Sequence, residues 1–242
     1  MKAVILAGGL GERLRPLTRA IPKALFPIGE KSLLEIQITR LAGNGFDEIF
    51  IATNYKSQYI ETFMGDGRRF GVSIQYSREM QPLGTCGPLS LLRRQLDEPF
   101  VVMNGDILTT MDFARFARDG YSQDSDFVIA TKNIRTPFNF GSVKTEGNRI
   151  VGVDEKPDLQ IEIVGGIYFM RPAVLELIPD DQFFGMNHLI ARMLQENRAI
   201  GRYVMEEFWL DIGNINDYNE AESAYQTHFE GAPVRDVAGT AL

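Results

Sequence analysis

The residues best suited to chemistry lie near the N-terminus, where an apolar run leads into a loop of glycines. Residues 4–6 are Val-Ile-Leu, and residues 8–11 read Gly-Gly-Leu-Gly. A buried strand that ends in such a loop exposes backbone N–H groups, which can bind phosphate oxygens. The cations Arg13, Arg15 and Lys23 follow and would neutralise an oligophosphate. The stretch therefore predicts a phosphate-binding loop, with a glycine turn flanked by solvated arginines as the structural alternative.

Two familiar phosphate-binding loops do not fit this stretch. A P-loop requires a Gly-Lys-Ser/Thr sequence, and the chain contains no Gly-Lys pair. A dinucleotide-binding loop requires a third glycine, where this chain has Leu14, and an acidic residue at the end of the second strand, where Thr53 and Asn54 stand. A nucleotide-dependent dehydrogenase is therefore disfavoured.

Two aspartates stand directly beside apolar strands. Asp106 follows Asn104 and Gly105 at the end of the apolar residues 100–103, and Asp211 lies between Leu210 and Ile212. Each aspartate alone would fit an ordinary turn. Mg²⁺ in proteins commonly takes one or two carboxylates together with phosphate oxygens and water. With the cationic glycine loop, the two aspartates favour a metal–phosphate site.

Two further segments have unusual compositions. Residues 154–157 read Asp-Glu-Lys-Pro, either a solvated charged turn or a site where Lys156 meets a second phosphate and Glu155 accepts hydrogen bonds from hydroxyls. Residues 81–88 are rich in glycine and proline and could present backbone groups to a flat base. Cys86 lies there without a nearby histidine, so a cysteine nucleophile is disfavoured.

The order of the predicted elements indicates the architecture. Strands and helices alternate through the first half, which predicts a mostly parallel sheet covered by helices on both faces. Ligands of such sheets bind beyond the carboxyl ends of the strands, so we expect residues 8–11 and 104–106 to meet. The predicted helices span residues 32–41, 57–64, 89–96, 186–197 and 214–227, and one more begins at Pro172. The predicted strands span residues 4–6, 48–52, 72–76, 100–103, 127–131 and 200–205. A hairpin is expected over residues 141–153, and an extended run over residues 161–170 is broken by Gly165–Gly166.

Length, composition and charge narrow the class of protein. A chain of 242 residues fits one large α/β domain, and a net charge of −7 without a basic patch argues against nucleic-acid and anionic-membrane partners. A single cysteine excludes intramolecular disulfides and Cys-rich zinc sites, and two dispersed histidines are too few for a His-based metal site. The start of the chain lacks a leader pattern and no run is long enough for a membrane helix, so we expect a cytoplasmic protein. Residues 229–242 are expected to form a loose tail, and a homodimer in which this tail packs on a partner is left open.

Six motifs in order carry a resemblance to a known family. They are residues 7–18 with Pro22-Lys23-Ala24-Leu25, residues 82–85, residues 104–106, residues 155–157, residues 165–169 and residues 209–213. Together they resemble the sugar-1-phosphate nucleotidyltransferase, or NDP-sugar pyrophosphorylase, family from residue 1 to about residue 225. The resemblance implies a nucleotide-diphospho-sugar transferase fold: an α/β, Rossmann-like, mostly parallel sheet sandwiched by helices, with a smaller β-hairpin and helix part for the sugar.

The resemblance also implies a reaction and a role for each residue. A nucleoside triphosphate and a sugar 1-phosphate would give an NDP-sugar and pyrophosphate, with Mg²⁺ as cofactor. The attacking phosphate oxygen is already an anion, so charge neutralisation and in-line positioning suffice. The implied catalytic residues are Arg15, Lys23 and Asp106; the nucleotide-binding residues are Leu6, Ala7, Gly8, Gly9, Gly11, Arg13, Gln81, Gly84 and Thr85; the sugar-phosphate-binding residues are Gly105, Gly141, Glu155, Lys156 and Gly166; and the metal ligands are Asp106 and Asp211.

The chain departs from the family's pattern in two places. Val164-Gly165-Gly166 replaces an Asn-Ala-Gly or Asn-Thr-Gly, and Cys86 stands where alanine is common. Residues 82–89 are most similar to guanylyltransferases of the GDP-mannose and GDP-heptose kind, so GTP and a hexose or heptose 1-phosphate are favoured. Transfer of a uridylyl or thymidylyl group to glucose or amino-sugar 1-phosphate, and a non-catalytic nucleotide-sugar sensor, remain alternatives. A cytidylyl- or molybdopterin-type enzyme is disfavoured by residues 155–157 and 209–213.

The expected organisation is one nucleotidyltransferase domain over residues 1–228. Its nucleotide-binding half spans about residues 1–110 and its sugar-phosphate-binding half about residues 111–228.

Overall fold

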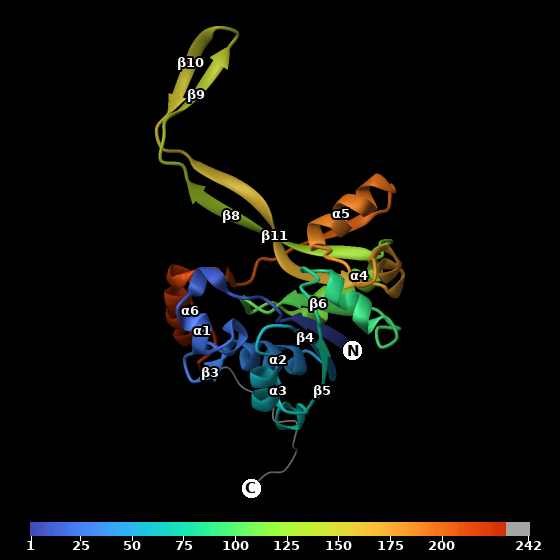
Figure 1. Ribbon diagram of the computed structural model, residues 1–242. Coiled ribbons are helices and arrows are strands. Elements are labelled where there is room, and N and C mark those ends of the chain that lie inside the picture. Colours follow the sequence, from blue (N-terminus) through green and yellow to red (C-terminus); the bar gives the residue numbers. More distant parts are fainter. Residues whose placement is uncertain (231–242) are drawn as a thin grey trace.

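A central sheet of seven strands runs through the computed structural model, which describes residues 1–230 (Figure 1). Its strands are β1 (Lys2–Leu6), β4 (Glu48–Thr53), β5 (Ser73–Arg78), β6 (Phe100–Asn104), β8 (Phe127–Pro137), β11 (Asp158–Met170) and β12 (Ile200–Val204). Their order is β12-β8-β11-β6-β1-β4-β5. Only β11 among them runs antiparallel to its neighbours, β6 and β8. The predicted α/β fold with a mostly parallel sheet is confirmed.

Helices cover both faces of this sheet. They are α1 (Leu17–Ala20), α2 (Leu33–Gly43), α3 (Ser57–Met64), α4 (Phe113–Ser122), α5 (Met186–Gln195) and α6 (Ile215–His228). Successive side chains of a strand point to opposite faces, so Ala3 and Ile5 pack in one core with α2, α3 and α4, whereas Val4 packs in the other with α5. A third core joins α6 to α2 and to the short strands described below.

Helix α2 follows from its sequence. Ser32 caps it: the Ser32 hydroxyl accepts a hydrogen bond from the Glu35 N–H at 3.3 Å, and the Glu35 carboxylate accepts one from the Ser32 N–H at 2.8 Å. This reciprocal pair satisfies two N–H groups that a helix start leaves unbonded. Leu34 and Ile38 then lie on the buried face at helical spacing. The predicted helix over 32–41 is confirmed.

Two predicted helices are 3₁₀ turns. The helix expected over 89–96 is η4 (Gly87–Leu92), and the one expected from Pro172 is η5 (Pro172–Leu177). Before η4, the N–H groups of Cys86 and Gly87 both donate to the carbonyl of Phe184. Three further 3₁₀ turns are η1 (Glu12–Leu14), η2 (Lys23–Leu25) and η3 (Arg68–Phe70). Helix α4 was not predicted, although Phe113, Phe116 and Gly120 recur on its buried face.

Three small antiparallel pairs complete the fold. They are β2 (Pro27–Ile28) with β3 (Lys31–Ser32), β7 (Ile107–Thr109) with β13 (Trp209–Asp211), and β9 (Ser142–Glu146) with β10 (Arg149–Asp154). The β9–β10 pair confirms the predicted hairpin. It continues the long β8–β11 ribbon beyond the central sheet, and the hairpin stands away from the rest of the molecule (Figure 1).

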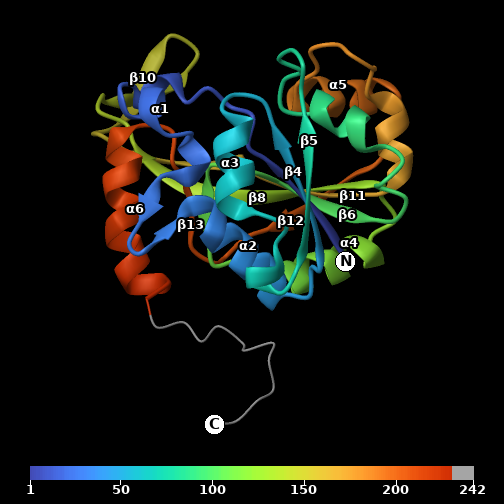
Figure 2. The same cartoon turned by 60° about the horizontal axis from the view of Figure 1, so that its bottom comes forward.

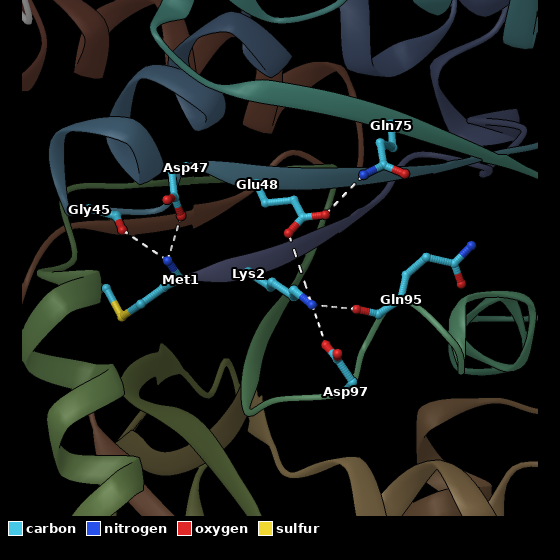
Figure 3. A network of polar contacts seen from close by, with 8 residues as sticks. All are labelled: Met1, Lys2, Gly45, Asp47, Glu48, Gln75, Gln95 and Asp97. Carbon is cyan, nitrogen blue, oxygen red and sulfur yellow. Dashed lines mark hydrogen bonds and ion pairs between the residues drawn. The ribbon is translucent and has the colours of Figure 1, made fainter.

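The amino edge of the sheet carries a polar network far from the glycine loops (Figure 3). The amino group of Met1 donates to the Asp47 carboxylate at 2.6 Å, and Lys2 Nζ pairs with Asp97 and donates to the Gln95 carbonyl at 2.7 Å. Glu48, at the start of β4, accepts from the Gln75 amide at 2.9 Å. These contacts connect the starts of β1, β4 and β5 and leave the carboxyl edge for the site.

The end of the described chain is packed. Phe229, expected to begin a loose tail, stacks on Tyr225 of α6 with ring centroids 6.2 Å apart, so the prediction is wrong at this residue. The rest of the predicted tail, residues 231–242, lies outside the described residues. Helix α6 lies beside α1 on one flank (Figure 2). Within residues 1–230 no helix has the length and apolar character needed to cross a membrane.

Candidate functional site

The ends of β1 and β6 lie side by side, as predicted. Leu6 is in register with Asn104, and the Gly105 N–H donates to the Leu6 carbonyl at 2.9 Å. A Cβ at Gly105 would lie only 2.7 Å from that carbonyl oxygen, so glycine is required for the approach. Ala7 continues β1 by donating to the Ala52 carbonyl at 2.8 Å. The glycine loop and the Asn104–Asp106 turn therefore form one edge.

Lys23 and the two predicted metal-binding aspartates gather at this edge. Lys23 Nζ lies 2.8 Å from Asp106 Oδ2, and both side chains are largely withdrawn from solvent. Asp211 ends β13 opposite Ile107, and the Ile212 N–H donates to the Asp106 carbonyl at 3.0 Å. The two aspartates therefore occupy adjacent chain segments, as predicted.

The charges around Asp211 affect its titration. Partial desolvation by the surrounding protein raises the pKa of Asp211, and the neighbouring Asp106 carboxylate raises it further, whereas Lys23 and Arg13 lower it. A divalent cation between the two carboxylates would relieve this repulsion. No group of three or more His, Cys, Asp or Glu side chains in residues 1–230 is arranged to hold a metal ion. Two carboxylates nevertheless suit Mg²⁺, which keeps several waters and takes phosphate oxygens.

Gln37 holds the Asp106 turn and was missed by the sequence analysis. Its buried side-chain amide donates to the carbonyls of Asn104 at 3.1 Å and Ile107 at 2.8 Å, on either side of Asp106. A glutamine on the otherwise apolar face of α2, between Leu34 and Leu41, was the signal that could have identified it. Gln37 fixes the turn without reaching the pocket lining.

A pocket of about 300 Å³ opens beside Asp106. Six predicted residues line it, and they are Leu6, Gly8, Gly9, Gly84, Thr85 and Asp106. Asn54, Glu79 and Phe183 also line it and were not predicted. The glycine loop therefore forms part of the wall of a pocket at the carboxyl edge of the sheet.

Glu79 is a second acidic group that lines this pocket, besides Asp106. It follows the last residue of β5, and its Oε1 lies 2.6 Å from where a Cβ on Gly8 would be. Its Oε2 accepts a hydrogen bond from the Leu83 N–H at 2.8 Å. Burial raises the pKa of Glu79, and the Leu83 N–H and the Asn54 side chain oppose that rise. The rule that ligands bind beyond the carboxyl ends of strands, applied to β5, would have identified it.

The second half of the chain supplies one wall of the pocket. The Phe184 N–H donates to the Leu83 carbonyl at 2.8 Å, and the Met186 N–H donates to Thr85 Oγ1 at 2.9 Å. The predicted nucleotide-binding residue Gln81 donates to the Asp181 carbonyl at 2.9 Å and is not among the lining residues. These bonds hold Phe183 against Gly84 at the mouth of the pocket.

The arginines of the opening loop occupy different places. The guanidinium of Arg13 lies 3.3 Å from where a Cβ on Gly213 would be, close to Asp211. Gly11 accepts a hydrogen bond from Thr18 Oγ1 at 2.9 Å. Arg15 instead pairs with Glu12 at 2.8 Å and lines an adjacent hollow of about 250 Å³. The structure thus brings Arg13 close to Asp211, whereas Arg15 lines the neighbouring hollow and not the 300 Å³ pocket.

The predicted sugar-phosphate residues fall into two separate groups. Gly166, with φ of 70°, lies against the Asn104 side chain at the carboxyl edge, together with Gly105. Gly141 and Glu155 lie together at the base of the β9–β10 hairpin, since a Cβ on Gly141 would be 3.3 Å from Glu155 Oε2, and Lys156 follows. In Figure 1 the β9–β10 hairpin stands away from β6, the strand that precedes Asp106.

Cys86 is unsuited to nucleophilic chemistry. It is fully buried, and burial raises the pKa of its thiol to about 12. The thiolate, which is the reactive form, is therefore scarce near neutral pH. The prediction against a cysteine nucleophile agrees with this environment.

Known proteins resemble this chain in both sequence and fold. Over 227 residues the chain is 34% identical to the probable mannose-1-phosphate guanylyltransferase 1 of Oryza sativa subsp. japonica, covering 90% of this chain and 63% of that protein. It is 32% identical over 230 residues to the D-glycero-alpha-D-manno-heptose 1-phosphate guanylyltransferase of Aneurinibacillus thermoaerophilus, covering 93% of this chain and 99% of that one. The chain therefore spans under two thirds of the rice protein but nearly all of the bacterial one.

A solved structure and a family match agree with these relatives. The crystal structure of HddC from Yersinia pseudotuberculosis complexed with GMP-PN superposes with a TM-score of 0.71 at 25% identity, covering 93% of this chain and 99% of that one. Residues 2–228 match the family described as Nucleotidyl transferase. This match spans the glycine loop, both aspartates and the β8–β11 ribbon. The chain belongs to the nucleotidyl transferase family.

Proposed function

We propose that this chain transfers a nucleotidyl group, preferentially from GTP, to a hexose or heptose 1-phosphate, giving an NDP-sugar and pyrophosphate. The observation that carries the proposal is the Lys23–Asp106 pair near Asp211, in which Asp106 also lines the pocket formed by Gly8, Gly9 and Gly84. Relatives named as mannose- and heptose-1-phosphate guanylyltransferases support the substrate class.

Nucleotidyl transfer requires neutralisation of the phosphates' negative charge more than it requires proton transfer. An oxygen of the sugar phosphate attacks the α-phosphorus, the bond to the β-phosphate oxygen breaks, and pyrophosphate leaves with the bonding electrons. Lys23 and Arg13 supply positive charge where the triphosphate meets the glycine loop. The backbone N–H groups of Gly8 and Gly9 hold phosphate oxygens in line. Arg15, at the rim, is assigned to the departing pyrophosphate.

A divalent metal, which this family generally uses, fits the two aspartates. We assign Mg²⁺ to Asp106 and Asp211, because the pair supplies hard oxygen ligands and leaves positions for phosphate and water. When bound, the ion polarises phosphoryl oxygens and screens their charge. Lys23 would supply a cation for phosphate beside these ligands, and Gln37 holds the Asp106 turn through the Asn104 and Ile107 carbonyls.

Glu79 supports guanine as the base. Guanine presents two adjacent donors, its ring N1–H and its exocyclic amino group, and a carboxylate can accept both. Uracil and thymine present one ring N–H donor between two carbonyl oxygens, and a carboxylate repels those two oxygens. Phe183 at the mouth offers an apolar surface for the base.

The remaining assignments extend the same proposal. Residues 1–110 bind the nucleotide, and residues 111–228 bind the sugar phosphate through Gly141, Glu155, Lys156 and Gly166, with Gly105 contributed by the first half. The substrates are small anions, with no nucleic acid or membrane partner, and we assign the protein to the cytoplasm.

Pyrophosphate release tests the reaction. The purified chain is given each of GTP, ATP, UTP, dTTP and CTP with mannose, glucose and heptose 1-phosphates in Mg²⁺. We expect the fastest release with GTP and a manno-configured sugar. Silence across every pair contradicts the proposal, and tight GDP-sugar binding by calorimetry without turnover would identify a sensor instead.

A further inference from the structure

Helix α2 presents three polar side chains to the chain segment that contains Asp106. They are Gln37, Arg40 and Asn44, here called the α2 polar stripe, and their spacing of three and four positions puts them on one side of the helix. Gln37 holds the Asp106 turn, as described above. Asn44 Oδ1 accepts a hydrogen bond from the Ala114 N–H at 3.2 Å, near the start of α4. The stripe therefore contacts this segment both before and after β7.

Arg40, in the middle of the stripe, binds backbone oxygens. Its Nη2 donates to the carbonyls of Thr110 at 2.6 Å and Met111 at 3.0 Å. These two residues directly follow β7, whereas Gln37 bonds to the carbonyl of Ile107, the first residue of β7. Two side chains of one helix thus hold β7 at both of its ends.

The position of Asp211 depends on β7. Within residues 1–230, β13 and β7 pair with each other in a sheet separate from the central one. Asp211 is in register with Ile107. The chain just before β13 is held by the turn that Arg40 binds, because the Thr110 N–H donates to the Phe208 carbonyl at 3.1 Å and Thr109 Oγ1 donates to the same oxygen at 2.6 Å. A displacement of β7 would therefore move Asp211 relative to the central sheet.

A guanidinium is a costly anchor at this place. Burial lowers the pKa of Arg40, and the carboxylates of Asp112 and Glu207 oppose that shift. Within residues 1–230 the buried Nε of Arg40 and the buried Oε1 of Gln37 have no hydrogen-bond partner, which costs free energy. The apolar core shared by α2, β7 and β13 stabilises their packing, but apolar contact is non-directional. Hydrogen bonds to carbonyls add the direction that metal ligands require.

We propose that Arg40 is a positioning residue for the metal site: by holding the turn after β7 to α2, it fixes β7 and, through β13, sets Asp211 near Asp106. Gln37 secures the Asp106 side of the carboxylate pair, and Arg40 secures the Asp211 side. Arg40 itself does not line the 300 Å³ pocket. The proposal rests on the proposed function for the use of the metal, whereas the placement of Asp211 does not depend on it.

The requirement for Mg²⁺ tests this role. Arg40→Met removes the donors but keeps an unbranched side chain, so the Mg²⁺ concentration for half-maximal pyrophosphate release should rise ~10–100-fold while the KM for GTP changes little. Arg40→Lys keeps a cation that can donate to the same carbonyls and should restore most of the affinity for Mg²⁺. An unchanged requirement in Arg40→Met overturns the proposal.

Arg171→Met is the matched control. The Arg171 guanidinium also donates to backbone carbonyls, those of Tyr121, Gln123 and Ser125, but Arg171 follows the end of β11, at the amino edge of the sheet. Its loss should lower the melting temperature and leave the Mg²⁺ requirement as in the wild type. A rise as large as that of Arg40→Met would show that any lost guanidinium has this effect, and it would contradict a specific role for Arg40.

Hydrogen exchange of the metal-free protein tests the placement without catalysis. Arg40→Met should speed the exchange of amides in β7 and β13, and of the Ile212 N–H that donates to Asp106, at least ~10-fold more than in β1 and β4. An equal increase in all peptides would reduce Arg40 to a contributor to global stability. Arg40→Gln, whose shorter amide cannot reach both carbonyls, gives the same test if the methionine variant does not fold.

A double-mutant cycle tests whether Arg40 acts through Asp211. In an Asp211→Asn background, Arg40→Met should cause little further loss of the residual turnover, because the ligand that Arg40 positions is already absent. Losses that simply add would contradict this route. If β13 loosens in Arg40→Met but the wild type releases no pyrophosphate with any substrate pair, the proposed function fails while the positioning role of Arg40 stands.

Discussion

Lys23 Nζ and Asp106 Oδ2 lie 2.8 Å apart although 83 positions separate the two residues in the chain. The contact joins the loop after β1 to the turn after β6. Asp106 alone would repel a triphosphate, and the Lys23 ammonium group beside it offsets that repulsion. The pair therefore supplies a cation for phosphate and a carboxylate for a metal at the same edge of the sheet.

Replacing Lys23 by Met should abolish most turnover. The change removes the cation and leaves Asp106 without its ion-pair partner, and loss of one such electrostatic contact typically lowers kcat ~100–1,000-fold. Steady-state pyrophosphate release measures the effect, and circular dichroism verifies the fold. Lys31→Met, on β3, is the control and should keep wild-type rates. A Lys23→Met enzyme with wild-type kcat would remove Lys23 from the reaction.

The raised pKa of Asp211 predicts an unusual pH dependence. Metal binding requires the carboxylate, so Mg²⁺ affinity should begin to fall, on acidification, at a pH above the ordinary aspartate value of about 3.9. A raised pKa also means that the folded state binds this proton more tightly than the unfolded state. Without metal, Asp211 therefore lowers stability as the pH rises above its unfolded-state pKa, and the loss is complete above its higher folded-state pKa.

Asp211→Asn should accordingly be more stable than the wild type at neutral pH in EDTA, while losing metal-dependent turnover. The stability difference should disappear at acidic pH, where the wild-type residue is protonated. Thermal unfolding measured from acidic to neutral pH gives the stability difference in both pH ranges. Asp66→Asn, on the surface, is the control. A less stable Asp211→Asn protein at pH 7 contradicts the sign of the shift.

Gln37→Met should weaken catalysis without touching substrate. Methionine has a similar length but cannot donate to the Asn104 and Ile107 carbonyls, so the Asp106 turn loses its brace. Supports behind metal ligands are typically worth ~10–100-fold in metal affinity or activity. The Mg²⁺ concentration for half-maximal rate should rise while the KM for GTP changes little. Gln195→Met, exposed on α5, is the control; an unchanged Mg²⁺ requirement in Gln37→Met would reduce Gln37 to a packing residue.

Glu79→Gln should relax the choice of base. The neutral amide offers one acceptor and one donor instead of two acceptors, so GTP loses a contact and UTP gains one. A bidentate contact to a base is worth about 1–3 kcal/mol of discrimination, so the GTP-to-UTP ratio of kcat/KM should fall ~10-fold or more. Glu48→Gln, at the amino edge of the sheet, is the control. An unaltered ratio would place base selection elsewhere in the pocket.

How far the sequence predicts the site depends on how local each contact is. Gly8, Gly9 and Asp106 were identifiable because a strand end and a glycine are local signals, and the rule for parallel sheets then brings them together. Glu79 and Gln37 act through contacts with Gly8 and with the Asn104–Ile107 turn, which no local pattern reveals. Arg15 was read as a free cation, but its pairing with Glu12 depends on the shape of η1.

The same distinction holds for the fold. Helix α2 was predicted with its cap because Ser32 and Glu35 stand three positions apart. The 89–96 segment was predicted as a regular helix, but the N–H groups before it bond to Phe184, almost one hundred residues later. The hairpin over 141–153 was predicted from its turn, whereas the Trp209–Gly165 hydrogen bond at the base of the β8–β11 ribbon joins residues 44 positions apart, which no local pattern reveals.

The antiparallel course of β11 has a consequence for divergence. β8 leaves the central sheet at its carboxyl edge, and β11 re-enters at that same edge, so everything between them is an insertion mounted on the rim of the site. Such an insertion can lengthen, shorten or change its tip without moving the register of β1, β4 or β6. The segment that carries Gly141, Glu155 and Lys156 can therefore change in length or sequence while the strands that position the phosphate-binding loop keep their register.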